Sequence, residues 1–268
     1  MEQFLVSHEG TVRLFAFAGL LLAFVAAEAL WPRRDRRQPR LRRWATNGAI
    51  TLLNTVALRV AVPVLAVGAA GFAQRLDVGL LNMWDPAPWL AFVIALVVLD
   101  LVIYAQHVVF HHVPLLWRIH RVHHADRDID ASTALRFHPV EIILSMGIKI
   151  AVVMALGAPP AAVIAFEIIL NGMAMFNHAN LRLPGALDGL LRLAVVTPDM
   201  HRVHHSVHMR ETNSNFGFNL SLWDRLFGTY RAAPEDGHDR MTIGLAEYQD
   251  DRPSQLGFAL WLPFTKGR

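Results

Sequence analysis

Five apolar stretches, each long enough to cross a lipid bilayer, constrain the fold of this 268-residue chain more than any other feature. A transmembrane helix needs about 20 mostly apolar residues. Buried helices of a soluble protein are the alternative, but the chain is 54% hydrophobic and 18% charged, against roughly 45–50% and 25% in soluble domains. We therefore predict five spans, at residues 14–31, 45–73, 88–106, 139–157 and 160–177.

A dense arginine run separates the first two predicted spans. An arm that binds nucleic acid is one interpretation, but a cytoplasmic loop that obeys the positive-inside rule fits better, because apolar spans flank the run on both sides. The same run argues that the first span is a membrane anchor and not a cleaved signal peptide. Seven arginines occupy eleven positions: Arg33, Arg34, Arg36, Arg37, Arg40, Arg42 and Arg43.

The position of this loop sets the predicted topology of the other segments. The N-terminus, residues 74–86 and the turn at 158–160 then lie outside, while residues 107–138 and everything after Asn177 lie inside. We predict an all-α polytopic helical bundle with a cytoplasmic, histidine-rich helical cap. It forms one integral membrane domain over residues 1–268, multi-pass and in the inner membrane if the protein is bacterial, whose metal-binding parts are 107–138 and 178–230.

Histidines fall almost entirely in the segments predicted to be cytoplasmic. Two copies of HRVHH stand 81 positions apart, and a further pair precedes the first copy with i, i+4 spacing. Residues at i, i+3 and i+4 share one face of a helix, so we expect each HRVHH to direct three imidazoles at one point. These histidines are His107 and His111, then His120, His123 and His124, then His201, His204 and His205, with His138 and His178 alone at the ends of spans.

Clustered neutral imidazoles are typical ligands of iron, zinc, copper or nickel. About nine candidate ligands exceed the four to six that one ion takes, so two ions that share the histidines are the economical solution. The absence of cysteine excludes iron–sulfur clusters and thiolate zinc sites. The cytoplasmic segments also lack Glu-x-x-His and HExxH motifs, which argues against carboxylate di-iron bundles and zinc proteases.

Other histidines are set aside on their positions. His112 points about 100° away from His111 around a helix. His8 and His238 are isolated, as solvated histidines commonly are. His208 shares a face with His201 and is either a ligand or a hydrogen-bond donor to one.

Ionisable residues within the spans are costly and usually face a bundle interior or a cavity. Asp100 continues the stripe of His107 and either orients that ring indirectly or pairs with Arg59 or another buried cation. Lys149 and Glu167 lie at similar depth, and we expect them to pair. Near the last histidine group, the side chains able to support a metal ligand are Asp199, Glu211, Asn213, Asn215 and Asp224.

At this level of detail the chain resembles a known family. The segments DLVIYAQHVVFHHVPLLWRIHRVHH, TALRFHPVE, FNHANLRLP and TPDMHRVHHSVHMRETNSNFGFNLSLWDRLFGTY are similar to the fatty acid hydroxylase/sterol desaturase superfamily. The resemblance spans roughly residues 100–230. It implies an integral membrane oxygenase in which histidines hold two irons that activate dioxygen, with sterols, fatty acyl groups, alkylglycerols or carotenoids as substrates.

Carried over residue by residue, the family's histidine motifs match the groups above. The resemblance implies that His107, His111, His120, His123, His124, His201, His204 and His205 bind metal, together with His178 and, as an extra ligand, His138. Val108 is a departure, because the family often has arginine at that position. This difference concerns a local salt bridge and not the metal.

The sequence therefore predicts a membrane-bound di-iron oxygenase that hydroxylates or desaturates a lipid, with zinc as a substitute for iron in purified protein. The chain has no recognisable flavin, nicotinamide or haem module, so electrons must come from an external ferredoxin- or cytochrome-type donor. No nucleic-acid partner is expected. The alternative is a non-oxygenase metal- or haem-binding membrane protein, either an electron carrier or a metal transporter. A transporter would place polar ligands near the bilayer midplane.

Overall fold

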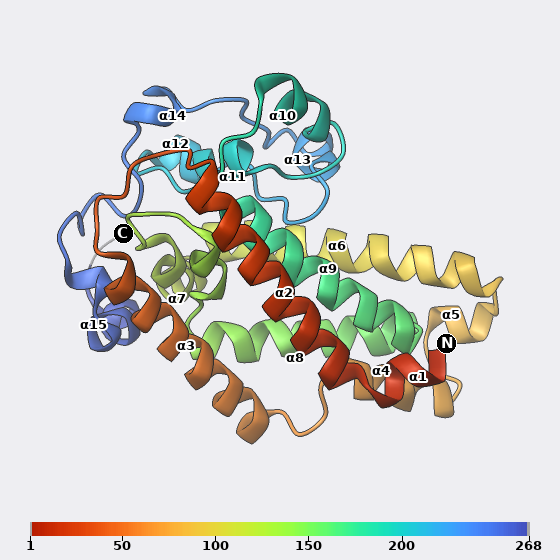
Figure 1. Cartoon of the computed structure of the whole chain (residues 1–268). Helices are drawn as coiled ribbons and strands as arrows, with labels where there is room; N and C mark the ends of the chain where they lie inside the picture. The colour runs from red at the N-terminus through yellow and green to blue at the C-terminus, as the bar shows by residue number, and fades with distance from the viewer. Residues whose placement is uncertain (1, 267–268) are drawn as a thin grey trace.

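A computed structural model, which describes residues 2–266, is all α-helical, with isolated bridges and no strand in that range (Figure 1). Five of its helices are long and apolar enough to cross a membrane, as the sequence predicts. Four of them are single continuous helices: α2 (Glu9–Leu30), α6 (Pro88–His112), α8 (Pro139–Leu156) and α9 (Pro160–His178).

The second predicted span is not one straight helix. Residues 45–73 are divided between α3 (Arg40–Ala61) and α4 (Ala66–Arg75), and the short α5 (Leu80–Trp84) follows. Pro63 lies at the break. Proline ends a helix here because it has no N–H to donate and its ring clashes with the preceding turn.

Packing within the bundle is organised around α8 and α9. Helices α2, α4 and α6 contact α9, whereas α3, α4 and α6 contact α8. The core between them is apolar and includes Leu99, Val153, Ile164 and Phe166. Burial of such side chains stabilises the bundle by about 1.5–3 kcal/mol each relative to exposure to water, and the bilayer covers the remaining apolar faces.

The hairpin of α8 and α9 is closed by a short turn at one end of the bundle. Gly157 caps α8 in the left-handed region with φ 67°, and Pro160 begins α9. Gly79, with φ 99°, lies directly against this turn, and a Cβ on Gly79 would stand 2.3 Å from the Gly157 backbone nitrogen. Only glycine permits this close backbone approach.

A charged group lies inside the bundle along α8 and α9. Lys149 Nζ donates to Glu167 Oε1 at 2.8 Å, which confirms the expected pairing. Arg13 of α2 adds a second ion pair, with Nη1 2.8 Å from Glu167 Oε2. These pairs compensate the charges in a region where an isolated charge is costly.

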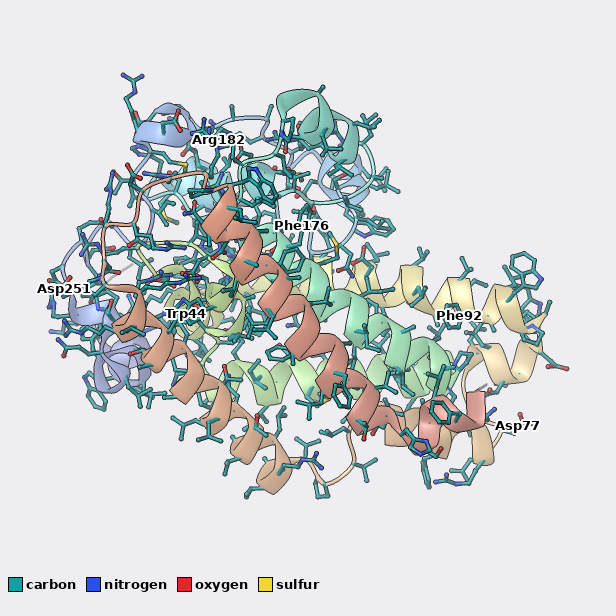
Figure 2. All side chains as sticks on the ribbon, viewed as in Figure 1. Trp44, Asp77, Phe92, Phe176, Arg182 and Asp251 are labelled. Carbon is teal, nitrogen blue, oxygen red and sulfur yellow. The ribbon has the colours of Figure 1, made fainter. Side chains whose placement is uncertain are left out.

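Helix α1 (Glu2–Ser7) contacts α2 and α9, and the remaining elements form a cap at the opposite end of the bundle (Figure 1). In Figure 2, Arg182 on the cap and Asp77 near the α4–α5 turn lie at opposite ends of the molecule. The cap helices are α7 (Pro114–His124), α10 (Gly185–Leu191), α11 (Pro198–His204), α12 (Met209–Thr212), α13 (Leu222–Leu226), α14 (Gly237–Arg240) and α15 (Leu256–Trp261), with 3-10 turns η1 (Ala131–Leu135), η2 (Arg252–Ser254) and η3 (Leu262–Phe264).

The arginine run lies at the cap end and is held by acidic partners. Arg33 Nε is 3.2 Å from Asp199 Oδ1, and both Arg36 and Arg40 approach Glu28 Oε2, at 3.7 and 3.6 Å. The run therefore connects the first two spans to the cap. It lies at the same end of the bundle as the histidines, in agreement with the relative topology that the sequence predicts.

Candidate metal centre

Nine histidines converge where the bundle meets the cap. They come from four helices, α6, α7, α9 and α11, and from the residue that follows α11. Every one is at most 7% exposed. The nine are His107, His111, His120, His123, His124, His178, His201, His204 and His205.

These nine side chains form two groups with the geometry of metal sites. Within each group, the ring nitrogens that could bind an ion all lie within 4.8 Å of one another. We call the groups cluster A and cluster B. Cluster A contains His107, His111, His120, His124 and His204, and cluster B contains His123, His178, His201 and His205.

Each HRVHH segment is divided between the two clusters, so the expectation that its three imidazoles meet at one point is wrong. The i, i+4 pair of the first segment, His120 and His124, joins cluster A, whereas His123 joins cluster B. In the second segment the assignment is reversed: the i, i+4 pair His201 and His205 belongs to cluster B, and His204 belongs to cluster A. Residues i and i+4 lie about 40° apart around a helix, but i+3 lies about 60° to the other side of i.

Hydrogen bonds at Nδ1 orient the rings of cluster A. His107 and His204 donate to the carbonyls of Phe216 and Ser214, at 2.7 and 2.8 Å. His111 Nδ1 is 3.2 Å from Asn213 Oδ1. A ring that donates from Nδ1 presents a lone pair at Nε2, and such bonds fix the tautomer and direction of metal-binding histidines.

The Nε2 atoms of cluster A fit a bound cation. All five are buried and have no hydrogen-bond partner among residues 2–266. Several buried lone pairs directed at one point repel each other and lack donors, a costly arrangement without a positive charge. The donor set, all imidazole nitrogen, suits iron, zinc, copper or nickel.

The ring nitrogens of cluster B also fit a bound cation, and three of them lie close to one another. His178 Nδ1 donates to the Ala174 carbonyl at 2.6 Å, so its Nε2 carries a lone pair. That Nε2 lies 2.9 Å from His123 Nε2 and 3.0 Å from His201 Nε2. Ligand atoms about 2.1 Å from one ion and 90° apart stand about 3.0 Å from each other.

Burial keeps these imidazoles in the neutral, metal-binding form. It lowers the pKa of His204 to about 3, against the effect of the hydrogen bond to the Ser214 carbonyl, which raises it. Burial and then the neighbouring rings lower the pKa of His124 and His205 well below the ordinary value. Protons therefore compete weakly with metal ions at these nitrogens.

Glu141, on the first turn of α8, is a functional residue that the sequence interpretation missed. Its Oε1 accepts from His120 Nδ1 at 2.6 Å, and its side chain is buried. A carboxylate behind a histidine is a common support for a metal ligand and strengthens the basicity of the ring. The sequence did contain a signal for this role. The carboxylate of FHPVE lies in the first turn of a predicted span, where a charged group needs a partner inside the protein.

Asp100 bonds a loop and does not pair with Arg59, which is not among its partners in residues 2–266. Its Oδ2 accepts from Trp223 Nε1 at 2.8 Å and from the Leu220 N–H at 3.3 Å. The same loop supplies the Phe216 carbonyl to His107. This arrangement is the one that the indirect alternative requires.

The five flanking polar residues named from the sequence take different roles. Asn213 contacts His111, and Asp224 accepts the backbone N–H groups of Phe216 and Gly217, at 2.7 and 2.8 Å. Asn215, with φ 53°, donates to the carbonyls of Met200 and Arg231. Asp199 and Glu211 pair with arginines, chiefly Arg33, Arg202 and Arg231.

His138 belongs to neither cluster, so the structure does not support it as a ligand. It caps the N-terminus of α8, where its Nδ1 accepts from the Val140 N–H at 3.2 Å. His112 Nδ1 bonds to the Val108 carbonyl, and His208 Nε2 lies 3.1 Å from Asp236 Oδ2 at the surface. His8 and His238 also lie outside both clusters.

A cavity of about 320 Å³ adjoins cluster A. It extends between α2, α3, α6, α8 and α9, and its wall contains the rings of His107 and His120. Its apolar lining includes Phe17, Leu58, Ile103, Phe110, Met146 and Phe218, and its polar lining includes Asn54, Gln106, Glu141, Lys149 and Glu167. A cavity of this size takes an apolar chain or ring system.

Comparisons with known proteins agree with this site. The chain is 28% identical over 237 residues to the ornithine lipid hydroxylase OlsE of Rhizobium tropici, covering 86% of this chain and 68% of that one. It is 33% identical over 152 residues to human alkylglycerol monooxygenase, a match that covers 57% of this chain and 33% of the relative. It is 26% identical over 142 residues to rat cholesterol 25-hydroxylase, a match that covers 53% of this chain and 47% of the relative. The chain thus spans a third to two thirds of the length of these relatives.

No solved structure matches the chain. The family model for fatty acid hydroxylases matches residues 92–229, a range that contains all nine clustered histidines and the loop that orients them. The chain belongs to the fatty acid hydroxylase family.

Proposed function

We propose that the protein is a membrane-bound di-iron monooxygenase that hydroxylates a C–H bond of a lipid. The carrying observation is that one cavity, largely apolar, is lined by His107 and His120 of cluster A. A lipid carbon in this cavity would therefore lie beside the metal-binding nitrogens. The relatives support hydroxylation over desaturation, because their names describe hydroxylases and monooxygenases.

In this proposal, cluster A and cluster B hold one iron each. Bound there, the irons would supply the activation of dioxygen, which no side chain can perform. One oxygen atom enters the C–H bond, and the other is reduced to water with two electrons and two protons. Five neutral nitrogens in one cluster and four in the other fit this role.

The protein's own residues orient the site and exclude water. The loop of residues 213–216 and Glu141 fix the directions of four cluster A rings through their Nδ1 atoms. Phe137 stacks on His123 with ring centroids 4.4 Å apart, and Phe216 packs against His107 and His204. These aromatic rings shield the clusters and hold the geometry that oxidation of one carbon requires.

The electrons come from a separate donor of the ferredoxin or cytochrome type, at the cytoplasmic face. This orientation rests on the positive-inside rule, because the arginine run lies at the same end as the clusters. Arg42 and Arg182, with side chains 45% and 62% exposed, are cations at that face that an acidic donor would contact in competition with their own partners, Asp251 and Asp239.

The test is lipid mass spectrometry of cells that produce the full chain, compared with cells that lack it. We expect one lipid class to gain one oxygen atom in cells with the wild-type protein and with His8→Ala. His123→Ala and His204→Ala should abolish the gain. Loss of two hydrogen atoms without added oxygen would show desaturation instead, and an unchanged lipid profile would overturn the proposed activity.

A further inference from the structure

The cavity wall beside cluster A carries hydrogen-bond acceptors that lack donors. Three buried oxygens have no hydrogen-bond partner among residues 2–266: Asn54 Oδ1, Gln106 Oε1 and Glu141 Oε2. Their side chains come from three different helices, α3, α6 and α8, and all three line the same cavity.

Each of these side chains is held by its other polar atom. Asn54 Nδ2 donates to the Phe137 carbonyl at 2.9 Å, which leaves the oxygen as the free end of the amide. Gln106 Nε2 donates to Ser145 Oγ at 2.6 Å. Glu141 Oε1 is occupied by His120. The three oxygens are therefore fixed acceptors.

Glu141 places one of these acceptors at the metal-binding end of the cavity, and the other two residues are linked to that end through their neighbours. Glu141 contacts His120 directly, and Gln106 precedes His107, whose ring centroid lies 5.0 Å from that of His120. Asn54 is bonded to Phe137, whose ring centroid is 6.1 Å from that of His120. A molecule that reaches His120 through the cavity therefore lies beside the Glu141 carboxylate, in a cavity that Asn54 and Gln106 also line.

A buried acceptor without a donor is costly, because it has lost its hydrogen bonds to water without a replacement. Asn54 and Glu141 are 7% and 4% exposed, so bulk water does not reach them freely. Three acceptors on the wall of one cavity call for a ligand that donates, and an ester or ether oxygen cannot do so. A hydroxyl or an amide N–H can.

We propose that these oxygens bind a hydrogen-bond donor of the lipid, so that the site selects lipids with a hydroxyl or amide N–H close to the carbon that is oxidised. The inference rests on the proposed function, because it names the substrate class of the same cavity. A site built to bond a polar group discriminates strongly against analogues that lack it, because its own buried groups are then left unpaired.

The experiment measures binding alone and needs neither oxygen nor electrons. The full chain in lipid nanodiscs is titrated with 1-hexadecanol and with its methyl ether, which accepts hydrogen bonds but cannot donate. We expect the alcohol to bind at least about tenfold more tightly, which corresponds to about 1.4 kcal/mol. Comparison of variants in identical nanodiscs cancels the different partitioning of the two probes into lipid.

Two variants test the acceptors independently. Asn54→Leu and Gln106→Met should each reduce the alcohol-to-ether ratio several-fold. Asn82→Leu is the control. Asn82 lies outside the cavity wall and donates to the Val78 carbonyl, so this variant should keep the wild-type alcohol-to-ether ratio.

Equal binding of the two probes by the wild type would overturn the proposal. So would an unchanged ratio in both cavity variants, because water would then be what satisfies the acceptors. Selective alcohol binding without any lipid oxidation in cells would leave this inference standing and refute the oxygenase activity. Lipid oxidation in cells without selective alcohol binding would refute this inference and leave the oxygenase activity standing.

Discussion

The guanidinium of Arg43 forms a two-bond ion pair with the carboxylate of Asp126, with Nε–Oδ1 2.7 Å and Nη2–Oδ2 2.8 Å. Arg43 ends the arginine run, and Asp126 follows the first HRVHH segment by two residues. Both side chains are at most 2% exposed, and Arg43 Nη1 also binds Asp130 at 2.7 Å. Although burial raises the pKa of Asp126, Arg43 and Arg136 lower it below its ordinary value.

This pair makes a prediction about stability. Arg43→Met leaves Asp126 and Asp130 buried without their cation, and removal of one partner from a buried pair costs about 3–5 kcal/mol. We expect a lower free energy of unfolding in detergent, measured by denaturant titration. Arg42→Met is the control, because its side chain is 45% exposed and 3.8 Å from Asp251, so its loss should change stability by less than about 0.5 kcal/mol. Equal effects of the two changes would contradict a structural role for the pair.

Glu141 makes a prediction about metal affinity. Glu141→Gln keeps an oxygen for His120 Nδ1 but removes the negative charge behind that ring. Loss of such a support typically lowers metal affinity about 10- to 100-fold. The measurement is competition with a calibrated chelator, with Glu247→Gln at the exposed surface as control. An affinity equal to that of the wild type would show that the 2.6 Å bond does not support a ligand.

The cavity makes a prediction that separates substrate access from metal binding. Leu58→Trp places a larger ring in a cavity of about 320 Å³, and lipid oxidation in cells should fall about tenfold or more. The metal content of the purified protein should not change, because Leu58 contributes no ligand. Leu52→Trp, at a position that is 66% exposed and outside the cavity wall, should leave product formation unchanged. Full product formation in Leu58→Trp would place the substrate elsewhere.

Much of the fold follows from hydropathy, because a bilayer requires continuous apolar helices and the five spans satisfy that requirement. The break at Pro63 shows the limit of the method, since an averaged window does not register one residue that ends a helix. Eight of the nine clustered histidines were likewise predictable from their i, i+3 and i+4 spacing, and His178 was predicted from the resemblance to the family. The inclusion of His138 was not supported, because its position at a helix start is also suited to capping.

Other features of the site depend on tertiary packing. Helix geometry separates His123 from His120 and His124, but which histidines of other helices complete each cluster depends on how those helices pack. Glu141 and the Phe216 carbonyl reach their histidines from 21 and 109 residues away. A backbone carbonyl carries no side-chain signature, so the support of His107 by Phe216 has no counterpart in the sequence pattern.

The most direct test of the two-cluster arrangement is the metal content of the purified full chain after anaerobic reconstitution with ferrous iron, measured by plasma mass spectrometry. We predict two ions per chain for the wild type and for His8→Ala. His204→Ala should impair cluster A and His123→Ala cluster B, so each variant should retain clearly fewer than two. A wild-type content of one ion or none, or a full content of two ions in both variants, would contradict the account.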